Sequence, residues 1–211
     1  MPTISRTTKA VLAAGVLVTS MGVIASTATA NSADLSASLE PAVLNGVDGG
    51  GTALVSVRGT RIDIAMVASG LLADAPHAAH IHFGADARHE CPSATDDSDG
   101  SGTLNTTEGA PAYGPVRVSL TKSGDTSPAS ALAIDRFDTA PGGELSYERG
   151  HIKVTQDVAK AVADGLGVIV IHGVDHNHDG VYSGTVGSDL DPSLPTEATD
   201  PALCGVITPQ D

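Results

Sequence analysis

Three histidines lie within six residues of one another in the stretch HAAHIHFG, which begins at His77. His80 and His82 are separated by one residue, and in a β-strand residues i and i+2 project from the same face. Two imidazoles placed in this way can bind one metal ion, and imidazole suits copper and zinc. The spacing therefore predicts two ligands of a copper or zinc site on one strand.

A third ligand must come from elsewhere in the chain. His172 is the strongest candidate, because it is the single polar residue at the end of the apolar run in VIVIHG. His77 and His89 flank the first strand and are weaker candidates for a further ligand. The alternative is that His80 and His82 only form hydrogen bonds in a polar seam. That alternative would be preferred for an isolated His-x-His, but the presence of His172 favours a metal site.

The acidic stretch DSDGSGTLNTTE, residues 97–108, matches the twelve-position calcium-binding loop. Gly102 stands where the loop turns sharply, and Leu104 takes the apolar eighth position. The alternative is a solvated acidic turn, but the match extends to the twelfth position and favours calcium. The predicted ligands are Asp97, Asp99, Ser101, the backbone of Thr103, Asn105 and Glu108.

The later stretch DHNHDGVYS repeats the front half of this loop, with Asp175, Asn177 and Asp179 at the ligand positions. Val186 stands at the twelfth position, where a glutamate is needed, so Asp189 or Asp191 would have to substitute. His176 and His178 could instead face the histidine site. A second calcium site and this alternative both stay open. Extracellular calcium sites of this kind have dissociation constants of about 10⁻⁴–10⁻³ M, so the expected role of the ion is structural.

Residues 1–30 have the pattern of a secretory signal peptide. Arg6 and Lys9 give a basic start, an apolar run follows, and small residues ending at Ala30 fit a cleavage site. The alternative is a retained amino-terminal membrane helix. Cleavage would leave one exported domain, residues 31–211, in which no stretch is apolar for the ~20 residues of a membrane span.

The charge of the chain argues against several classes of partner. The formal net charge is −14, and loss of the two basic residues of the signal segment would make it −16. Nucleic acids and anionic membranes would be repelled. Tryptophan is absent and only two phenylalanines and three tyrosines are present, which argues against an aromatic platform for sugars or single strands. Metal ions are the expected partners.

Both cysteines, Cys91 and Cys204, lie in the exported part of the chain. An even number of cysteines in an exported protein indicates a disulfide, and two free thiols are the alternative.

Alternating polar and apolar residues predict many short strands separated by glycine-rich turns. This pattern indicates an all-β sandwich or barrel with one short helix, predicted at 157–165. Polar segments at 92–115 and 175–201 interrupt the strands and are expected to hold the distinctive chemistry. The predicted strands are 34–41, 51–59, 60–69, 78–83, 116–122, 131–135, 144–155 and 167–173.

The order of these motifs resembles that of the Cu,Zn superoxide dismutases. HAAHIHFG, preceded by the turn Gly70-Leu71, is similar to the copper-binding strand of that family, and VIVIHG is similar to its later strand ending in a ligand histidine. LCGVI, residues 203–207, is similar to the family's carboxyl-terminal Cys-Gly-Val-Ile, and AHIH also occurs in CHRD domains, which are extracellular β-sandwich modules. The resemblance covers most of 51–207. It implies an antiparallel Greek-key β-sandwich, copper ligands at His80, His82 and His172, and a Cys91–Cys204 bridge.

The chain also departs from the dismutase pattern. No histidine lies between Cys91 and Pro115, where the family places its bridging histidine and zinc ligands, and Pro201 stands at the position of its active-site arginine. A copper-only site is therefore expected, and the sequence leaves open whether it turns over superoxide. The leading hypothesis is an exported copper protein with structural calcium. The competing hypothesis is a non-enzymatic, calcium-stabilised extracellular binding module.

Overall fold

Nine strands form one continuous sheet in the computed structural model, which describes residues 1–2 and 32–210. The predicted signal peptide, 1–30, lies outside the described residues except for its first two. The strands follow the order β5-β4-β7-β8-β1-β2-β3-β6, with β9 paired to β1, and all their pairings are antiparallel. The elements are β1 (Ser32–Pro41), β2 (Gly50–Arg58), β3 (Arg61–Ser69), β4 (Ala79–His82), α1 (Thr106–Tyr113), β5 (Val116–Ser119), β6 (Leu145–Lys153), α2 (Gln156–Ala163), β7 (Val168–His172), β8 (Pro201–Val206) and β9 (Thr208–Pro209).

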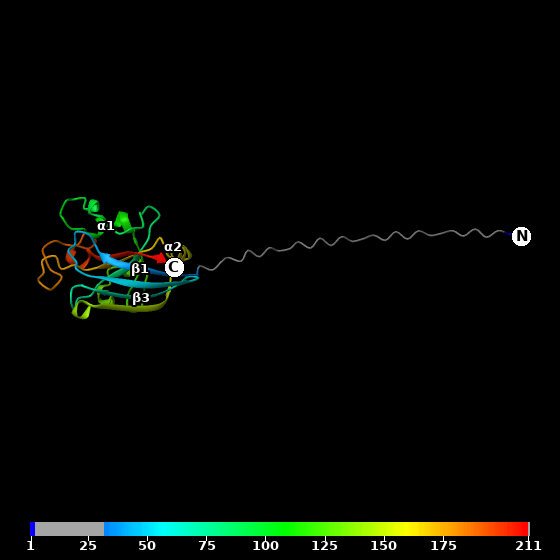
Figure 1. The fold of residues 1–211 in the computed structure, drawn as a ribbon, viewed down its shortest axis with the longest axis horizontal. Coiled ribbons are helices and arrows are strands. Elements are labelled where there is room, and N and C mark those ends of the chain that lie inside the picture. Colours follow the sequence, from blue (N-terminus) through cyan, green and yellow to red (C-terminus); the bar gives the residue numbers. More distant parts are fainter. Residues whose placement is uncertain (3–31, 211) are drawn as a thin grey trace.

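The sheet curls into a half-barrel at β1, which links its two parts by pairing with both β2 and β8. Most of β1 pairs with β2, while its last two residues, Glu40 and Pro41, pair with β8. The β1-β2-β3-β6 part thus faces the β8-β7-β4-β5 part, and two short helices complete the fold (Figure 1). No helix in the described part of the chain combines the length and apolar character needed to cross a membrane.

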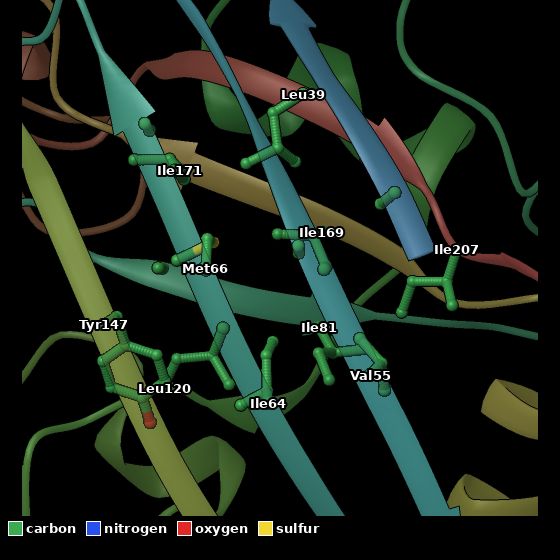
Figure 2. Packing of buried hydrophobic residues seen from close by; sticks show 14 of the residues in the cluster. Leu39, Val55, Ile64, Met66, Ile81, Leu120, Tyr147, Ile169, Ile171 and Ile207 are labelled. Atoms are coloured by element: carbon green, nitrogen blue, oxygen red, sulfur yellow. The ribbon is translucent and has the colours of Figure 1, made fainter. Parts of the chain in front are cut away.

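The hydrophobic core lies between these two parts of the sheet. Figure 2 shows the strands that carry Val55, Ile64 and Met66 crossing in front of the strands that carry Ile81 and Ile169, with these side chains between them. In β3 the buried residues alternate with less buried ones, as the period-two pattern predicts. Burial of each large aliphatic side chain contributes about 1.5–3 kcal/mol, so this face fixes the register of the strands.

Strands β4 and β7 are buried at every position, unlike β3. One face of each strand contacts the core, through residues such as Ile81 and Ile169. The other face lies under the polar segments, and Figure 1 shows α1 and its loop beside the chain that leads into β8. His80 and His82 alternate with Ile81 and therefore lie on this second, covered face.

Two sequence predictions about local structure are wrong. The predicted strand at 131–135 is a turn that leads into the 3₁₀ helix Ile134–Arg136. Its alternating pattern is only five residues long, and Pro128 has already started a 3₁₀ turn before it. The prediction of a single helix also fails, because α1 is a second one. Asn105 caps α1, and its capping box with Glu108 was hidden inside the predicted calcium loop.

Two other predictions are confirmed. The helix expected at 157–165 is α2, which begins after the capping residue Thr155. Cys91 and Cys204 form a disulfide with Cα atoms 5.7 Å apart, joining the segment after β4 to β8. The described part of the chain is thus mainly β, with one curled antiparallel sheet and two short helices.

Candidate metal centres

Strands β4 and β7 bring His80, His82 and His172 together, as the sequence predicted. The two strands are antiparallel neighbours, and Val170 lies directly opposite His80. Because paired residues share a face, His172, two residues beyond Val170, projects on the same side as both β4 histidines. The ring centroids are 5.1 Å apart for His80 and His172, 5.6 Å for His80 and His82, and 5.9 Å for His82 and His172.

Each of the three rings uses one nitrogen to donate a hydrogen bond to a backbone carbonyl. His80 Nε2 lies 3.1 Å from Ala131 O, His82 Nδ1 lies 2.8 Å from Gly114 O, and His172 Nδ1 lies 2.6 Å from Thr199 O. A carbonyl oxygen only accepts, so these nitrogens carry the protons. The tautomers are therefore fixed, and the opposite nitrogen of each ring keeps its lone pair.

The three remaining nitrogens are buried and have no hydrogen-bond partner among the described residues. They are His80 Nδ1, His82 Nε2 and His172 Nε2, and one ligand atom from each ring lies within 4.8 Å of the other two. A buried polar atom left unpaired costs about 1–3 kcal/mol, so three such atoms gathered at one point need an explanation. Three convergent lone pairs on neutral imidazoles fit a transition-metal ion.

The environment keeps these rings neutral at physiological pH. Burial, with a smaller contribution from the neighbouring His172, lowers the pKa of His82 to about 3. Burial lowers the pKa of His172 to about 4, against the opposing effects of the Thr199 hydrogen bond and of Asp189. Burial also holds the pKa of His80 well below its usual value. The rings therefore present lone pairs without first losing a proton.

The two histidines considered as further ligands lie outside this cluster. Nδ1 of His77 is 2.9 Å from the carbonyl oxygen of His172, and Nε2 is 3.1 Å from that of Leu72. His77 therefore supports the backbone at the end of β7 and is not one of the three gathered rings. The ring of His89 stacks on Phe83 instead, with centroids 5.5 Å apart.

The first acidic loop gathers the carboxylates of Asp97, Asp99 and Glu108, one oxygen of each lying within 4.8 Å of the others. Asp97 accepts the backbone N–H groups of Ser101 and Gly102 at 3.1 and 2.9 Å, which folds the loop around its first carboxylate. Ser101 Oγ lies 3.1 Å from the carbonyl of Thr103, another predicted ligand. Carboxylate, hydroxyl and carbonyl oxygens at one point are the ligands that Ca²⁺ prefers.

Helix α1 positions the last two predicted ligands of this loop. Asn105 Oδ1 accepts the Glu108 N–H at 2.9 Å and so acts as the cap of the helix. Glu108 is only 7% exposed, and its Oε1 accepts the N–H of Ser98 at 2.9 Å and that of Asp99 at 3.3 Å. The twelfth-position carboxylate thus already closes the loop.

The second acidic loop has the same local geometry. Asp175 accepts the N–H groups of Asp179 and Gly180 at 3.2 and 2.9 Å, just as Asp97 does in the first loop. The counterpart of Asp99 is Asn177, an amide, but the counterpart of Ser101 is Asp179, so both loops offer two carboxylates at positions one, three and five.

Glu197 closes the second loop, and the sequence analysis missed it. Its Oε1 accepts the N–H groups of His176 and Asn177 at 3.0 and 3.3 Å, the same two loop positions that Glu108 holds in the first loop. It lies in the 3₁₀ helix Thr196–Ala198, far beyond the twelfth position, and is 4% exposed. One signal was available, because Glu197 is the only glutamate after Glu148.

The other residues considered for this loop make different contacts. Asp189 Oδ2 accepts the N–H of Thr107 at 2.6 Å, and Asp191 Oδ1 accepts that of Ser193 at 2.9 Å. His176 Nε2 pairs with Asp200 at 2.9 Å, and His178 is exposed. Neither histidine belongs to the three-ring cluster.

Comparison with models of known protein families gives no match to this chain, and comparison with curated proteins gives none either.

Proposed function

We propose that this is an exported protein that binds one copper ion through His80, His82 and His172 and binds calcium through its two acidic loops. The observation that carries the proposal is the set of three buried ring nitrogens that have no hydrogen-bond partner within residues 32–210. Each is unprotonated because the opposite nitrogen of its ring holds the proton and donates it to a carbonyl. A polar seam would pair these atoms with one another or with the backbone.

The choice of copper rests on ligand chemistry and on the resemblance to dismutases. Neutral imidazoles suit both copper and zinc, and for the same nitrogen ligands divalent copper binds more tightly than zinc. The order of the histidine and cysteine motifs resembles that of the dismutases and so favours copper. The same resemblance is our reason for proposing that the curled sheet is a Greek-key sandwich. When bound, copper would supply a redox-active centre with a coordination position left open by the protein.

The calcium part of the proposal rests on the twelve-position match of the first loop and on the buried glutamates that close both loops. Ca²⁺ takes six to eight oxygens, and the ligands here come from loop carboxylates, one hydroxyl and backbone carbonyls. Calcium would tie α1 and the 3₁₀ helix of Glu197 to the sheet.

Export is supported by the signal-like segment at 1–30 and by the disulfide, since disulfides persist in oxidising compartments. The acidic charge fits a protein whose partners are metal ions rather than nucleic acids or anionic membranes.

Metal analysis of protein purified without a histidine tag tests this proposal. The parent is expected to bind one copper per chain, and His80→Gln and His172→Gln are expected to lose it. His151→Asn is the matched control, because His151 is an exposed histidine of β6 and asparagine tolerates its positive φ of 60°. Calcium binding without copper would contradict the copper site and support the competing hypothesis of a calcium-stabilised, non-enzymatic binding module, the role that the CHRD resemblance implies.

A further inference from the structure

The three-histidine cluster opens onto one small cavity of about 30 Å³. A space of this size accommodates about two water-sized molecules, or one diatomic molecule. The histidines line this cavity, and Leu132 and Leu190, which are 38% and 48% exposed, are the two exposed residues of its lining. We therefore take these two leucines as the solvent side of the cavity.

The remaining lining of the cavity is apolar apart from two threonines, and none of its described lining residues is charged. Both threonine hydroxyls donate elsewhere: Thr106 Oγ1 to the carbonyl of Thr199 at 2.6 Å, and Thr199 Oγ1 to Ser188 Oγ at 2.7 Å. Neither threonine hydroxyl is therefore a free donor for a bound anion. The charged side chain that acts on His172 is the carboxylate of Asp189, which would repel an anion.

We propose that this cavity makes the copper site selective for a small uncharged ligand, such as a neutral diatomic molecule, and disfavours anions, superoxide included. This inference rests on the copper site proposed above and adds its ligand class. An anion entering the cavity would lose its hydration shell and gain neither a free hydroxyl donor nor a cation from the side chains that line it. An uncharged diatomic loses little hydration and fits the volume.

Two small probes of different charge test this inference, and the charge variants described below separate the effect of charge from that of size. Carbon monoxide, which binds cuprous ions, is followed by its infrared stretch on the cuprous form of the protein. Azide, an anion that binds cupric ions, is followed by the optical spectrum of the cupric form. The parent is expected to bind carbon monoxide stoichiometrically and to show no azide saturation at millimolar concentrations.

Charge variants at the mouth of the cavity sharpen the test. Leu190→Lys places a cation at the entrance and is expected to raise azide affinity about tenfold. Leu132→Lys is a second variant from the opposite loop. Val186→Lys is the matched control, because Val186 is 65% exposed on the same segment as Leu190 but does not line the cavity. It should change azide affinity less than twofold.

The outcomes separate this inference from the proposed function. Failure of the parent to bind copper overturns both. Stoichiometric copper with tight azide binding in the parent, or without carbon monoxide binding, overturns the ligand class alone. Azide affinity that rises in both Leu→Lys variants but not in Val186→Lys supports it.

Discussion

The carbonyl oxygen of Thr199 accepts a hydrogen bond from Nδ1 of His172 at 2.6 Å. The same oxygen accepts a second one, also at 2.6 Å, from Thr106 Oγ1 at the first turn of α1. Thr199 directly follows the 3₁₀ helix that contains Glu197. The segments that close the two acidic loops therefore meet at the Thr199 carbonyl oxygen, which orients the ring of His172. We expect ordering of these loops to hold this ring in place.

Thr106→Val tests this link, since valine keeps the shape of threonine but removes the donor to Thr199. Mutation of a residue that hydrogen-bonds a metal ligand typically changes metal affinity 10–100-fold. Thr106 is one hydrogen bond further from the metal position, because it contacts the carbonyl that orients His172. A loss of roughly fivefold in copper affinity is expected, measured by competition with a chelator of known affinity. Thr107→Val is the control, because this neighbouring side chain is exposed and only the backbone N–H of Thr107 contacts Asp189. Equal affinities for both variants would contradict the link.

The closing glutamates predict how calcium stabilises the protein. With dissociation constants of about 10⁻⁴–10⁻³ M, 10 mM calcium should stabilise the fold by about 1.4–2.7 kcal/mol per site. Glu108→Gln and Glu197→Gln are each expected to remove one site and about half of the calcium-dependent rise in Tm. Scanning calorimetry with and without calcium measures this rise, and Glu144→Gln, on an exposed side chain, is the control. A full rise in Glu197→Gln would show that Glu197 is not a ligand.

Burial of the three histidines predicts an acid-sensitive stability for the copper-free protein. The pKa of His82 falls to about 3 and that of His172 to about 4, both mainly through burial, from the ordinary value of 6.5. Between pH 6.5 and about 4, His82 and His172 therefore bind protons in the unfolded chain but stay neutral in the folded chain. Stability should fall with decreasing pH, by about 1.4 kcal/mol per pH unit for each such histidine.

Urea unfolding of the copper-free protein from pH 7 to pH 5 measures this slope. His82→Gln is expected to reduce the average slope over this range by about 1 kcal/mol per pH unit, because the unfolded histidine is only partly protonated above pH 6, whatever the effect of the substitution on stability at pH 7. The His151→Asn control should leave it unchanged. An unaltered slope in His82→Gln would mean that this ring already accepts a proton in the folded state.

The sequence predicted the parts of the fold and site that depend on local periodicity. Alternation placed Ile62, Ile64 and Met66 on the buried face of β3, and the i, i+2 spacing placed His80 and His82 on one face of β4. These predictions succeed because a strand repeats every two residues.

What the sequence could not predict depends on contacts between distant segments. Glu197 closes a loop that begins at Asp175, and this pairing exists only because a 3₁₀ helix before β8 packs against that loop. Helix α1 was missed for a different reason. Asn105 and Glu108 match both the calcium-loop pattern and a capping box, and only the capping box indicates that a helix begins there.

The disulfide provides a last prediction, because Cys91 and Cys204 are 113 residues apart. Closing so long a loop in the unfolded chain contributes about 4–5 kcal/mol in the chain-entropy account. The double variant Cys91→Ala, Cys204→Ala should lose most of this free energy of unfolding in urea; alanine is used because Cys204 is buried. If the bond acts on the unfolded state, the m-value should also rise, since the uncrosslinked chain expands further and exposes more surface. A loss of stability with an unchanged m-value would instead assign the effect to packing of Cys204 in the folded state.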